Sequence, residues 1–308
     1  MPKYSKIYVA GHKGLVGSAL VRNLTKEGYE NLLLKTRQEL NLLDQKAVKA
    51  FFAEEKPEYV FLAAAKVGGI MANKTHMADF AYENLEIQNN VIWAAHQQGV
   101  KKLLFLGSSC IYPGECPQPM KEEYLLTGKP EPTNEGYALA KIAGLKLCRY
   151  IYDQYGQKFI SVMPTNLYGP NDNFDLESSH VLPAMIRKFH EAKIRGNNKM
   201  VLWGTGSPRR EFMHVDDLAD ACTFLMQNYD NPDFINIGTG EDTTIKELAI
   251  TIKEIIGFEG NIIWDTEKPD GMMKKLLDVK KLHKFGWKHK INLREGIKNT
   301  YQWFLNYR

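Results

Sequence analysis

A tyrosine and a lysine stand four positions apart, at Tyr137 and Lys141, where apolar residues begin to recur with helical spacing. Both side chains therefore project from one face of the predicted helix. A free tyrosine has a pKa of about 10, and an ammonium nearby stabilises its phenolate, so the pair can exchange a proton with a substrate oxygen. This spacing also arises by chance in helices, and then both residues would belong to the core or the surface.

Ser108 follows an apolar run over residues 102–107 that predicts a strand. Side chains just beyond the carboxyl end of a parallel strand line the binding crevice of an open sheet. A serine at this point can hydrogen-bond a substrate carbonyl beside Tyr137. Serine, tyrosine and lysine together are typical of short-chain dehydrogenases.

A glycine-rich loop separates the first predicted strand from the helix that follows it: Gly11-His12-Lys13-Gly14-Leu15-Val16-Gly17. Glycine permits the tight turn and lets backbone N–H groups approach a pyrophosphate at the start of a helix. The spacing is GxxGxxG and not the commoner GxGxxG, and any tight turn would use glycine. The setting between strand and helix is what predicts a dinucleotide site.

The end of the second predicted strand distinguishes the two nicotinamide cofactors. Enzymes that use NAD place a carboxylate there for the ribose hydroxyl, whereas this chain has Lys35-Thr36-Arg37. Arg37 can pair with the ribose phosphate of NADP. A surface arginine without this role is the alternative, but the sequence favours NADP(H).

The first half of the chain alternates short apolar runs with amphipathic stretches, the pattern of a parallel sheet with crossover helices. The expected strands are 6–10, 31–35, 59–64, 102–107 and 159–163, and the expected helices are 16–26, 44–55, 79–98 and 137–155. This predicts an α/β fold with a doubly wound parallel sheet of the Rossmann type.

The alternation becomes irregular after Pro164, where Asn, Gly and Pro are frequent. We therefore expect residues 1–165 to form the NADP-binding domain and 166–308 to form mainly a smaller α/β substrate domain. A helix near 214–228 is expected to return to the first domain. Further helices are expected over 245–256 and 294–305.

Composition excludes several function classes. The 40 basic and 36 acidic residues give a net charge of +4, spread along the chain except for small clusters at Lys274-Lys275 and Lys280-Lys281, which is not the pattern of a nucleic-acid site. The few extra cations suit an anionic small substrate, but such an excess is also common on solvated faces. No apolar run approaches the roughly 20 residues that span a bilayer, and the chain starts directly with a strand, which predicts a cytoplasmic protein. The four cysteines are then reduced thiols, and no zinc-ligand spacing predicts a metal site.

Longer strings of the chain resemble the GDP-L-fucose synthase family, within the extended short-chain dehydrogenase/reductases. The strings are 11–14, 63–70, 107–113, 164–170, 210–212, 268–271 and Trp287, which together span nearly the whole chain. The resemblance implies conversion of GDP-4-keto-6-deoxy-D-mannose to GDP-L-fucose. In one site, two sugar carbons flanking the ketone are inverted and the ketone is then reduced with NADPH.

The resemblance also implies residue roles. Ser108, Tyr137 and Lys141 would form the reductase group, and Cys110 and His180 the acid/base pair of the epimerisation. The implied cofactor residues are Gly11, His12, Gly14, Leu15, Val16, Gly17, Arg37, Leu106, Ser108, Lys141, Pro164, Asn166, Leu167 and His180; the implied substrate residues are Lys188, Trp203, Arg210 and Asp270. Without the resemblance, Cys110 would be interpreted as an inert buried cysteine and His180 as a residue that starts a helix.

If the segment after the fourth strand is extended, Ser108 and Cys110 face the same side, because side chains alternate along a strand. Two positions depart from the family pattern: Gly136 replaces a common proline and Gly114 a common lysine. These departures leave room for a related GDP-linked keto sugar.

Two other functions stay open at this point. An epimerase or dehydratase of the same fold would recycle a tightly bound NAD(P), and stoichiometric consumption of NADPH would separate it from a reductase. A module that only binds or senses NADP would not need Tyr137 and Lys141. The apolar residues on more than one face of helices 79–98 and 137–155 suit the interface of a homodimer, with complete burial in one subunit as the alternative.

Overall fold

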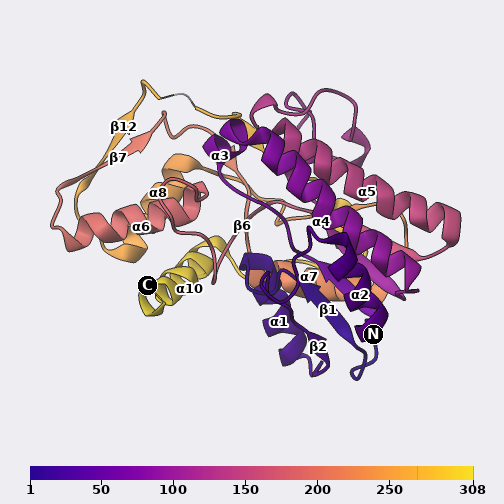
Figure 1. The fold of residues 1–308 in the computed structure, drawn as a ribbon. Helices are drawn as coiled ribbons and strands as arrows, with labels where there is room; N and C mark the ends of the chain where they lie inside the picture. The colour runs from indigo at the N-terminus through magenta and orange to yellow at the C-terminus, as the bar shows by residue number, and fades with distance from the viewer. Residues whose placement is uncertain (269, 308) are drawn as a thin grey trace.

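The computed structural model describes residues 1–268 and 270–307; Pro269, which belongs to the 268–271 string, lies outside the described residues. A six-stranded sheet forms the centre of the larger lobe (Figure 1). Its strands, in spatial order, are β10 (Ile235–Ile237), β5 (Lys158–Pro164), β4 (Lys102–Leu106), β3 (Tyr59–Leu62), β1 (Ile7–Ala10) and β2 (Leu32–Leu33). All five neighbouring pairs are parallel, which confirms the predicted sheet type.

The strand order reverses at β1. The chain runs from β1 to β2 on one side and then crosses to β3 on the other side, so β1 and β3 meet at a topological switch point. Ligands of open α/β sheets bind at the carboxyl ends of the strands at such a point. The switch point therefore lies where the glycine-rich loop follows β1.

Helices cover both faces of this sheet, which explains why its inner strands are almost continuously apolar. On one face, α2 (Gln45–Glu55), α4 (Met77–Gln97) and α5 (Glu135–Tyr155) pack around Phe52 and Val91. On the other face, α1 (Leu15–Lys26) and α7 (Val215–Asn228) pack around Leu20 and Leu225. These helices occupy the stretches expected from the sequence, and Asp44 caps α2 by accepting hydrogen bonds from two backbone N–H groups.

Strand β10 was not expected from the sequence. It has only three residues and follows α7. The segment that returns to the main sheet therefore includes a strand paired with β5 as well as the expected helix. A strand this short carries no usable apolar alternation of its own, and its pairing with β5 comes from packing in the folded chain.

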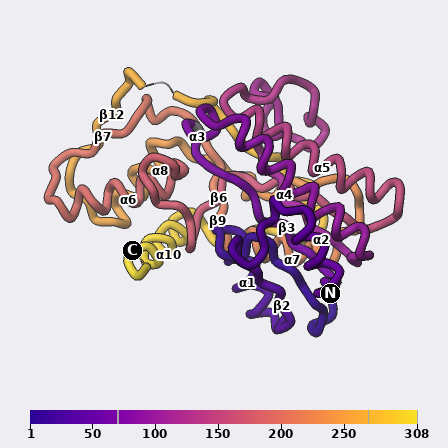
Figure 2. The backbone as a smooth tube through the Cα atoms, viewed as in Figure 1, coloured from indigo at the N-terminus to yellow at the C-terminus, as the bar shows by residue number. Residues whose placement is uncertain are grey.

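The smaller lobe lies to one side of the sheet, as the backbone trace in Figure 2 shows. Its core is formed by α6 (Val181–Ile194), α8 (Ile245–Ile256) and α10 (Leu293–Asn306), with Phe189 and Ile252 at the centre. Short strands complete it: β7 (Lys199–Trp203) pairs with β12 (Asn261–Asp265), β6 (Asn166–Tyr168) with β9 (Phe212–His214), and β8 (Arg209–Arg210) with β11 (Thr243–Thr244) and β13 (Lys274–Lys275). The short helices α3 (Ile70–Thr75) and α9 (Lys280–Lys284) belong to the larger lobe, where α3 contacts α4 and α9 contacts β10.

No helix in the described part of the chain is both long enough and apolar enough to cross a membrane.

Candidate active site

Two glycines of the segment 11–17, which runs from the end of β1 into the first turn of α1, have no space for a side chain. Gly11 has φ +84°, and a Cβ there would lie 2.8 Å from the backbone nitrogen of Ala64. A Cβ on Gly17 would lie 2.0 Å from the carbonyl oxygen of Gly11. Gly14 stands at the N-cap of α1, and no side chain caps this helix. The backbone N–H groups at the start of α1 are therefore open to an approaching anion, and a pyrophosphate fits this position.

His12 links this loop to the end of the second strand. Burial and the neighbouring Lys13 charge lower the pKa of its imidazole, while Glu39 and a backbone hydrogen bond with Lys35 act in the opposite direction. Arg37 is exposed in the turn that follows β2. The glycine-rich loop and the residue predicted to distinguish NADP thus lie at the same edge of the sheet.

Ser108 and Cys110 lie in a short 3-10 turn directly after β4, so the segment is not extended and strand alternation does not apply to it. Ser108 is the N-cap of this turn, and its hydroxyl oxygen accepts a hydrogen bond from the Cys110 backbone N–H at 3.2 Å. Ser108 hydrogen-bonds the Tyr137 phenol, and Cys110 is near enough to act on the phenol electrostatically. The turn therefore brings both residues to the neighbourhood of Tyr137.

Tyr137 and Lys141 stand one turn apart on α5, as the spacing predicted. The Lys141 side chain is 3% exposed, and its Nζ donates to the Leu106 carbonyl at 2.8 Å and lies 5.8 Å from the centre of the Tyr137 ring. Burial lowers the pKa of Lys141 to about 7. An ammonium at this place is favourable only when negative charge develops beside it.

The pKa of Tyr137 moves in the opposite direction from the one expected. Burial raises it above its ordinary value, the Cys110 charge raises it further, and the hydrogen bond with Ser108 only partly opposes this. Tyr137 is therefore protonated near neutral pH, which is the state needed to donate a proton to a ketone oxygen.

His180 directly precedes α6 and lies close to Lys275 of β13. Although part of the residue is open to solvent, desolvation of its ring lowers the pKa of His180, and the Lys275 charge lowers it further. Lys275 also reaches Cys110, with 3.5 Å between Nζ and Sγ. Sequence reasoning missed Lys275, because it stands in a lysine pair that resembles a solvated face.

The other predicted cofactor residues lie at the carboxyl ends of two central strands. Leu106 is the last residue of β4, Pro164 is the last residue of β5, and Asn166 and Leu167 lie in β6 immediately after it. The Asn166 amide donates to the Glu211 carbonyl at 2.8 Å. The structure therefore brings these residues to the edge of the sheet where Ser108 and Lys141 also lie.

Lys188 and Trp203 meet in the smaller lobe. Trp203 is 65% exposed, and the Nζ of Lys188 lies 5.8 Å from the centre of its indole ring. Lys268, which was not predicted, lies 5.9 Å from the same centre. An exposed aromatic ring flanked by two cations suits an anionic ligand with a flat group.

Arg210 and Asp270 also lie near each other. Burial lowers the pKa of Arg210, and the Asp270 charge opposes this. Asp270 accepts hydrogen bonds from the backbone N–H and the hydroxyl of Thr205, at 3.0 and 2.6 Å. Its carboxylate thus fixes a turn beside Arg210, the structural role that an aspartate in a loop commonly has.

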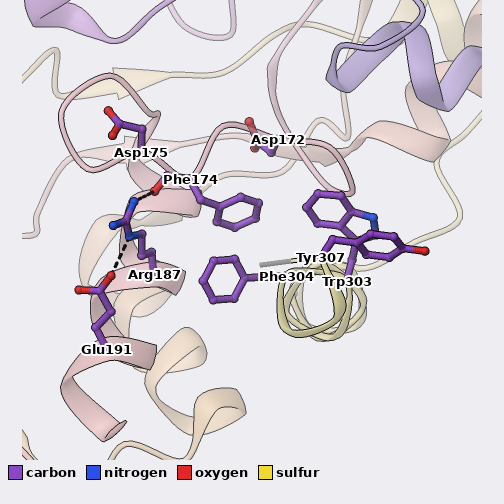
Figure 3. A pocket seen from close by; sticks show the side chains of 8 residues that line it. All are labelled: Asp172, Phe174, Asp175, Arg187, Glu191, Trp303, Phe304 and Tyr307. Atoms are coloured by element: carbon purple, nitrogen blue, oxygen red, sulfur yellow. Dashed lines mark hydrogen bonds and ion pairs between the residues drawn. The ribbon is translucent and has the colours of Figure 1, made fainter. Parts of the chain in front are cut away.

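A separate hollow lies between α6 and α10 (Figure 3). Phe174 and Trp303 stack across it with ring centres 6.1 Å apart, and Arg187 pairs with Glu191 at its rim at 2.8 Å. None of the predicted catalytic residues lines this hollow. It is not part of the candidate active site.

Comparison with known proteins places the chain in a family. Residues 7–238 match the model of the NAD dependent epimerase/dehydratase family. The chain is 60% identical to GDP-L-fucose synthase 1 of Arabidopsis thaliana, over 98% of this chain and 94% of the relative, and 54% identical to GDP-L-fucose synthase of Escherichia coli (strain K12), over 97% and 96%. A solved structure of a GDP-mannoheptose C4 reductase from Campylobacter jejuni with NADP bound has a TM-score of 0.90 and 48% identity, and each chain covers 99% of the other.

The predicted resemblance is thus confirmed over almost the full length of the chain, and the geometry and the comparisons agree. The chain belongs to the NAD dependent epimerase/dehydratase family.

Proposed function

We propose that the protein converts GDP-4-keto-6-deoxy-D-mannose to GDP-L-fucose by two epimerisations beside the ketone followed by NADPH-dependent reduction. The observation that carries this proposal is the convergence of two kinds of acid/base group. Ser108 and Tyr137, which suit reduction, hydrogen-bond each other, and Ser108 also accepts from the Cys110 N–H. Lys275 contacts Cys110 and acts electrostatically on His180. The names of the curated relatives support the same reaction.

NADP(H) is the proposed cofactor. The residues at the site fit it, because Gly11 and Gly17 leave room for no side chain and the start of α1 has no cap. The loop from Gly11 to Gly17 would hold the pyrophosphate and Arg37 the ribose phosphate, while Lys141 would hold the nicotinamide ribose. When bound, NADPH supplies the hydride for the reduction.

In the reduction, Ser108 orients the ketone by a hydrogen bond to its oxygen. Tyr137 donates its proton to that oxygen, since burial keeps the phenol protonated. Lys141, one turn away and without a carboxylate partner among the described residues, stabilises the phenolate as it forms.

In the epimerisation, the ketone makes the hydrogens on its neighbouring carbons acidic. One group must remove a proton from one face of the sugar, and another must return a proton to the opposite face. Cys110 and His180 are the proposed pair, and they come from separate elements, the turn after β4 and the residue before α6. The protein is thus proposed to be an isomerase as well as an oxidoreductase.

We further propose that residues 1–165, with the returning segment, hold the cofactor and that 166–308 hold mainly the sugar nucleotide. Lys188, Trp203 and Arg210 would contact the nucleotide end, with Asp270 supporting the turn next to Arg210. The proposed location is the cytoplasm, where four free cysteines stay reduced.

Incubation with GDP-4-keto-6-deoxy-D-mannose and NADPH tests the proposed function. One NADPH should be consumed per product, and NMR should identify the product as GDP-L-fucose. A product inverted at neither carbon would reduce the proposal to a simple reductase, and turnover without net NADPH consumption would favour an epimerase or dehydratase that recycles its cofactor.

A related GDP-linked keto sugar is the second candidate. It is favoured by the similarity to the GDP-mannoheptose reductase and by Gly136, where a Cβ would lie 2.8 Å from Met77 at the start of α4. The backbone at Met77 thus comes closer to the helix that carries Tyr137 than a larger residue at 136 would allow. A GDP-linked 4-keto-heptose as a competing substrate in the same assay distinguishes the two candidates.

Replacing Arg37 by alanine should weaken the binding of NADPH much more than the binding of NADH. A guanidinium pairs with the ribose phosphate that only NADPH carries, and a charge-assisted contact of this kind contributes about 1.5–3 kcal/mol, or roughly 10- to 100-fold in KM. Steady-state kinetics with both cofactors measures the ratio, and Arg22→Ala on α1, whose native side chain pairs with Asp216, serves as the control. An unchanged ratio in Arg37→Ala would exclude this role.

We propose that α4 and α5 form the interface of a homodimer. They pack against each other (Figure 1) and leave Tyr82, Trp93 and Tyr150 exposed, while Ile92 and Ile151 are buried within the chain. Exposed aromatic side chains on two adjacent helices suit a two-fold helix bundle.

A charge on this surface should dissociate the dimer. Tyr150→Glu should shift the sedimentation mass from about twice the 35.2 kDa chain toward the single chain, whereas Tyr307→Glu, at the exposed residue that follows α10, should not. A wild-type protein that sediments as a monomer at micromolar concentration would rule the dimer out.

A further inference from the structure

Lys275 is the cation that the folded chain brings to Cys110. Its Nζ lies 3.5 Å from Sγ, although the two residues are 165 positions apart. Cys110 also acts electrostatically on Tyr137 of α5, and Lys275 acts in the same way on His180, before α6. Lys141 is directed elsewhere, because its Nζ donates to the Leu106 carbonyl. Among the described contacts, Lys275 alone presents a positive charge to the thiol.

The backbone of Lys275 is fixed from two sides, which distinguishes it from a lysine on a solvated surface. On one side, β13 pairs with β8, and the Glu211 N–H donates to the Lys275 carbonyl at 3.3 Å. On the other side, the Leu276 N–H donates to the Gln118 side chain at 2.9 Å. The buried Glu211 carboxylate then accepts from the Leu277 N–H at 2.9 Å.

Lys274, the neighbouring residue, has a different environment. It is exposed, and its ammonium pairs with Asp242 at 3.1 Å. Successive side chains of a strand point to opposite faces, so only one of the two lysines can reach the site. The pair that resembles a solvated cluster in the sequence thus contains one surface lysine and one lysine of the site.

We propose, on the basis of the epimerase function proposed above, that Lys275 is a positioning residue whose ammonium forms an ion pair with the Cys110 thiolate and keeps this base charged between turnovers. A thiolate is the nucleophilic and basic form of cysteine, and a cation at this distance favours it over the thiol. During the inversion the C–H bond breaks, its electron pair enters the enolate, and the proton forms the S–H bond of Cys110. Lys275 keeps its own protons throughout.

The state of His180 supports this assignment. In many enzymes an imidazolium is the counter-ion of a catalytic thiolate. Here desolvation of the ring and the Lys275 charge both lower the pKa of His180, which disfavours the imidazolium as the counter-ion. Lys275 therefore provides the counter-charge for Cys110 and leaves His180 free to exchange protons with the sugar.

The pH dependence of Cys110 alkylation tests the ion pair without any substrate. Cys148 and Cys222 are buried, and Cys116→Ser removes the remaining accessible thiol, so the rate with iodoacetamide reports on Cys110. In this background Lys275→Met should move the midpoint of the rate profile upward by about 1–2 pH units, because it removes an adjacent opposite charge. At pH 7 this makes alkylation roughly 10- to 100-fold slower.

Three further variants separate electrostatics from structure. Lys275→Arg should restore the midpoint, and Lys274→Met should leave it unchanged. Lys275→Gln repeats the charge removal if the methionine variant does not fold, and circular dichroism and NADPH binding report on folding. An alkylation midpoint that is the same in the wild type, Lys275→Met and Lys275→Gln would overturn the proposal.

Solvent deuterium exchange then connects the ion pair to the reaction. Lys275→Met should slow the incorporation of deuterium at the carbons beside the ketone near pH 7. The rate of incorporation should recover toward the wild-type rate as the pH rises, and the KM for NADPH should be unchanged. Loss of exchange that does not recover at high pH would show a structural role and would also overturn the proposal. If the wild type exchanges no sugar hydrogen while the alkylation shift is observed, the proposed function fails and the ion pair stands.

Discussion

Replacing Tyr137 by phenylalanine is expected to lower the rate of reduction by about 10²- to 10⁴-fold, the usual contribution of a positioned general acid. The phenol is the group that the Ser108 hydroxyl contacts and that burial keeps protonated, so the ketone oxygen loses its proton source. Phenylalanine keeps the ring against Lys141, and the fold should therefore survive. The measurement is NADPH oxidation under saturating substrate.

Tyr155, at the other end of α5, provides the control for this experiment. Tyr155→Phe changes the same atom at the exposed far end of the helix and should leave the rate unchanged. NADPH binding to Tyr137→Phe, followed by cofactor fluorescence, should remain near that of the wild type. Near-normal NADPH oxidation by Tyr137→Phe would show that another group donates the proton.

The same variant separates the two halves of the reaction. Inversion beside the ketone does not require a proton from Tyr137, so the variant should still incorporate deuterium from heavy water into the sugar. Loss of exchange together with loss of reduction would instead mean that Tyr137 acts before the first inversion.

Replacing Cys110 by serine is expected to lower deuterium incorporation at the carbons beside the ketone by about 10²- to 10⁴-fold. A hydroxyl is a much weaker acid than a thiol and is not an anion near neutral pH, so Lys275 would face a neutral group. The backbone hydrogen bond from residue 110 to the Ser108 hydroxyl does not involve the thiol, and the 3-10 turn should persist. NMR of the sugar after incubation in heavy water gives the rate at each carbon.

The matched control is Cys116→Ser, a nearby cysteine that is also partly exposed but whose thiol faces the Pro117 carbonyl. The Cys116→Ser variant should incorporate deuterium into the sugar at the wild-type rate. His180→Asn should slow completion of the inversion, because the second proton exchange loses its partner. Wild-type rates of fully inverted product from both Cys110→Ser and His180→Asn would make these residues structural and move the epimerisation to other acids.

Much of the fold could be predicted from the sequence because the relevant signals are local. The spacing of apolar residues follows the period of a helix or a strand, so the positions of α1, α2, α4 and α5 could be inferred without knowledge of their partners. The glycine-rich loop could be recognised for the same reason. A positive φ at Gly11 and the contact between Gly17 and Gly11 constrain residues only a few positions apart.

The spacing of Tyr137 and Lys141 also placed these two residues correctly, but it could not give their protonation. Burial lowers the pKa of Lys141, whereas burial and the Cys110 charge raise the pKa of Tyr137. Cys110 and the Leu106 carbonyl that accepts from Lys141 come from another part of the chain. The sequence suggested a lysine that lowers the tyrosine pKa, whereas the fold encloses the phenol and raises it. Desolvation is a property of the packed site and not of a helix face.

The remaining features were decided by tertiary structure alone. The three-residue strand β10 has no recognisable pattern, and its place beside β5 depends on the return of α7 to the sheet. Lys275 looked like half of a solvated lysine pair, yet the hydrogen bonds that hold β13 direct it to a thiol 165 positions away. Local periodicity determines which elements form, whereas long-range packing determines which charges meet, because electrostatic contacts depend on distance in space and not along the chain.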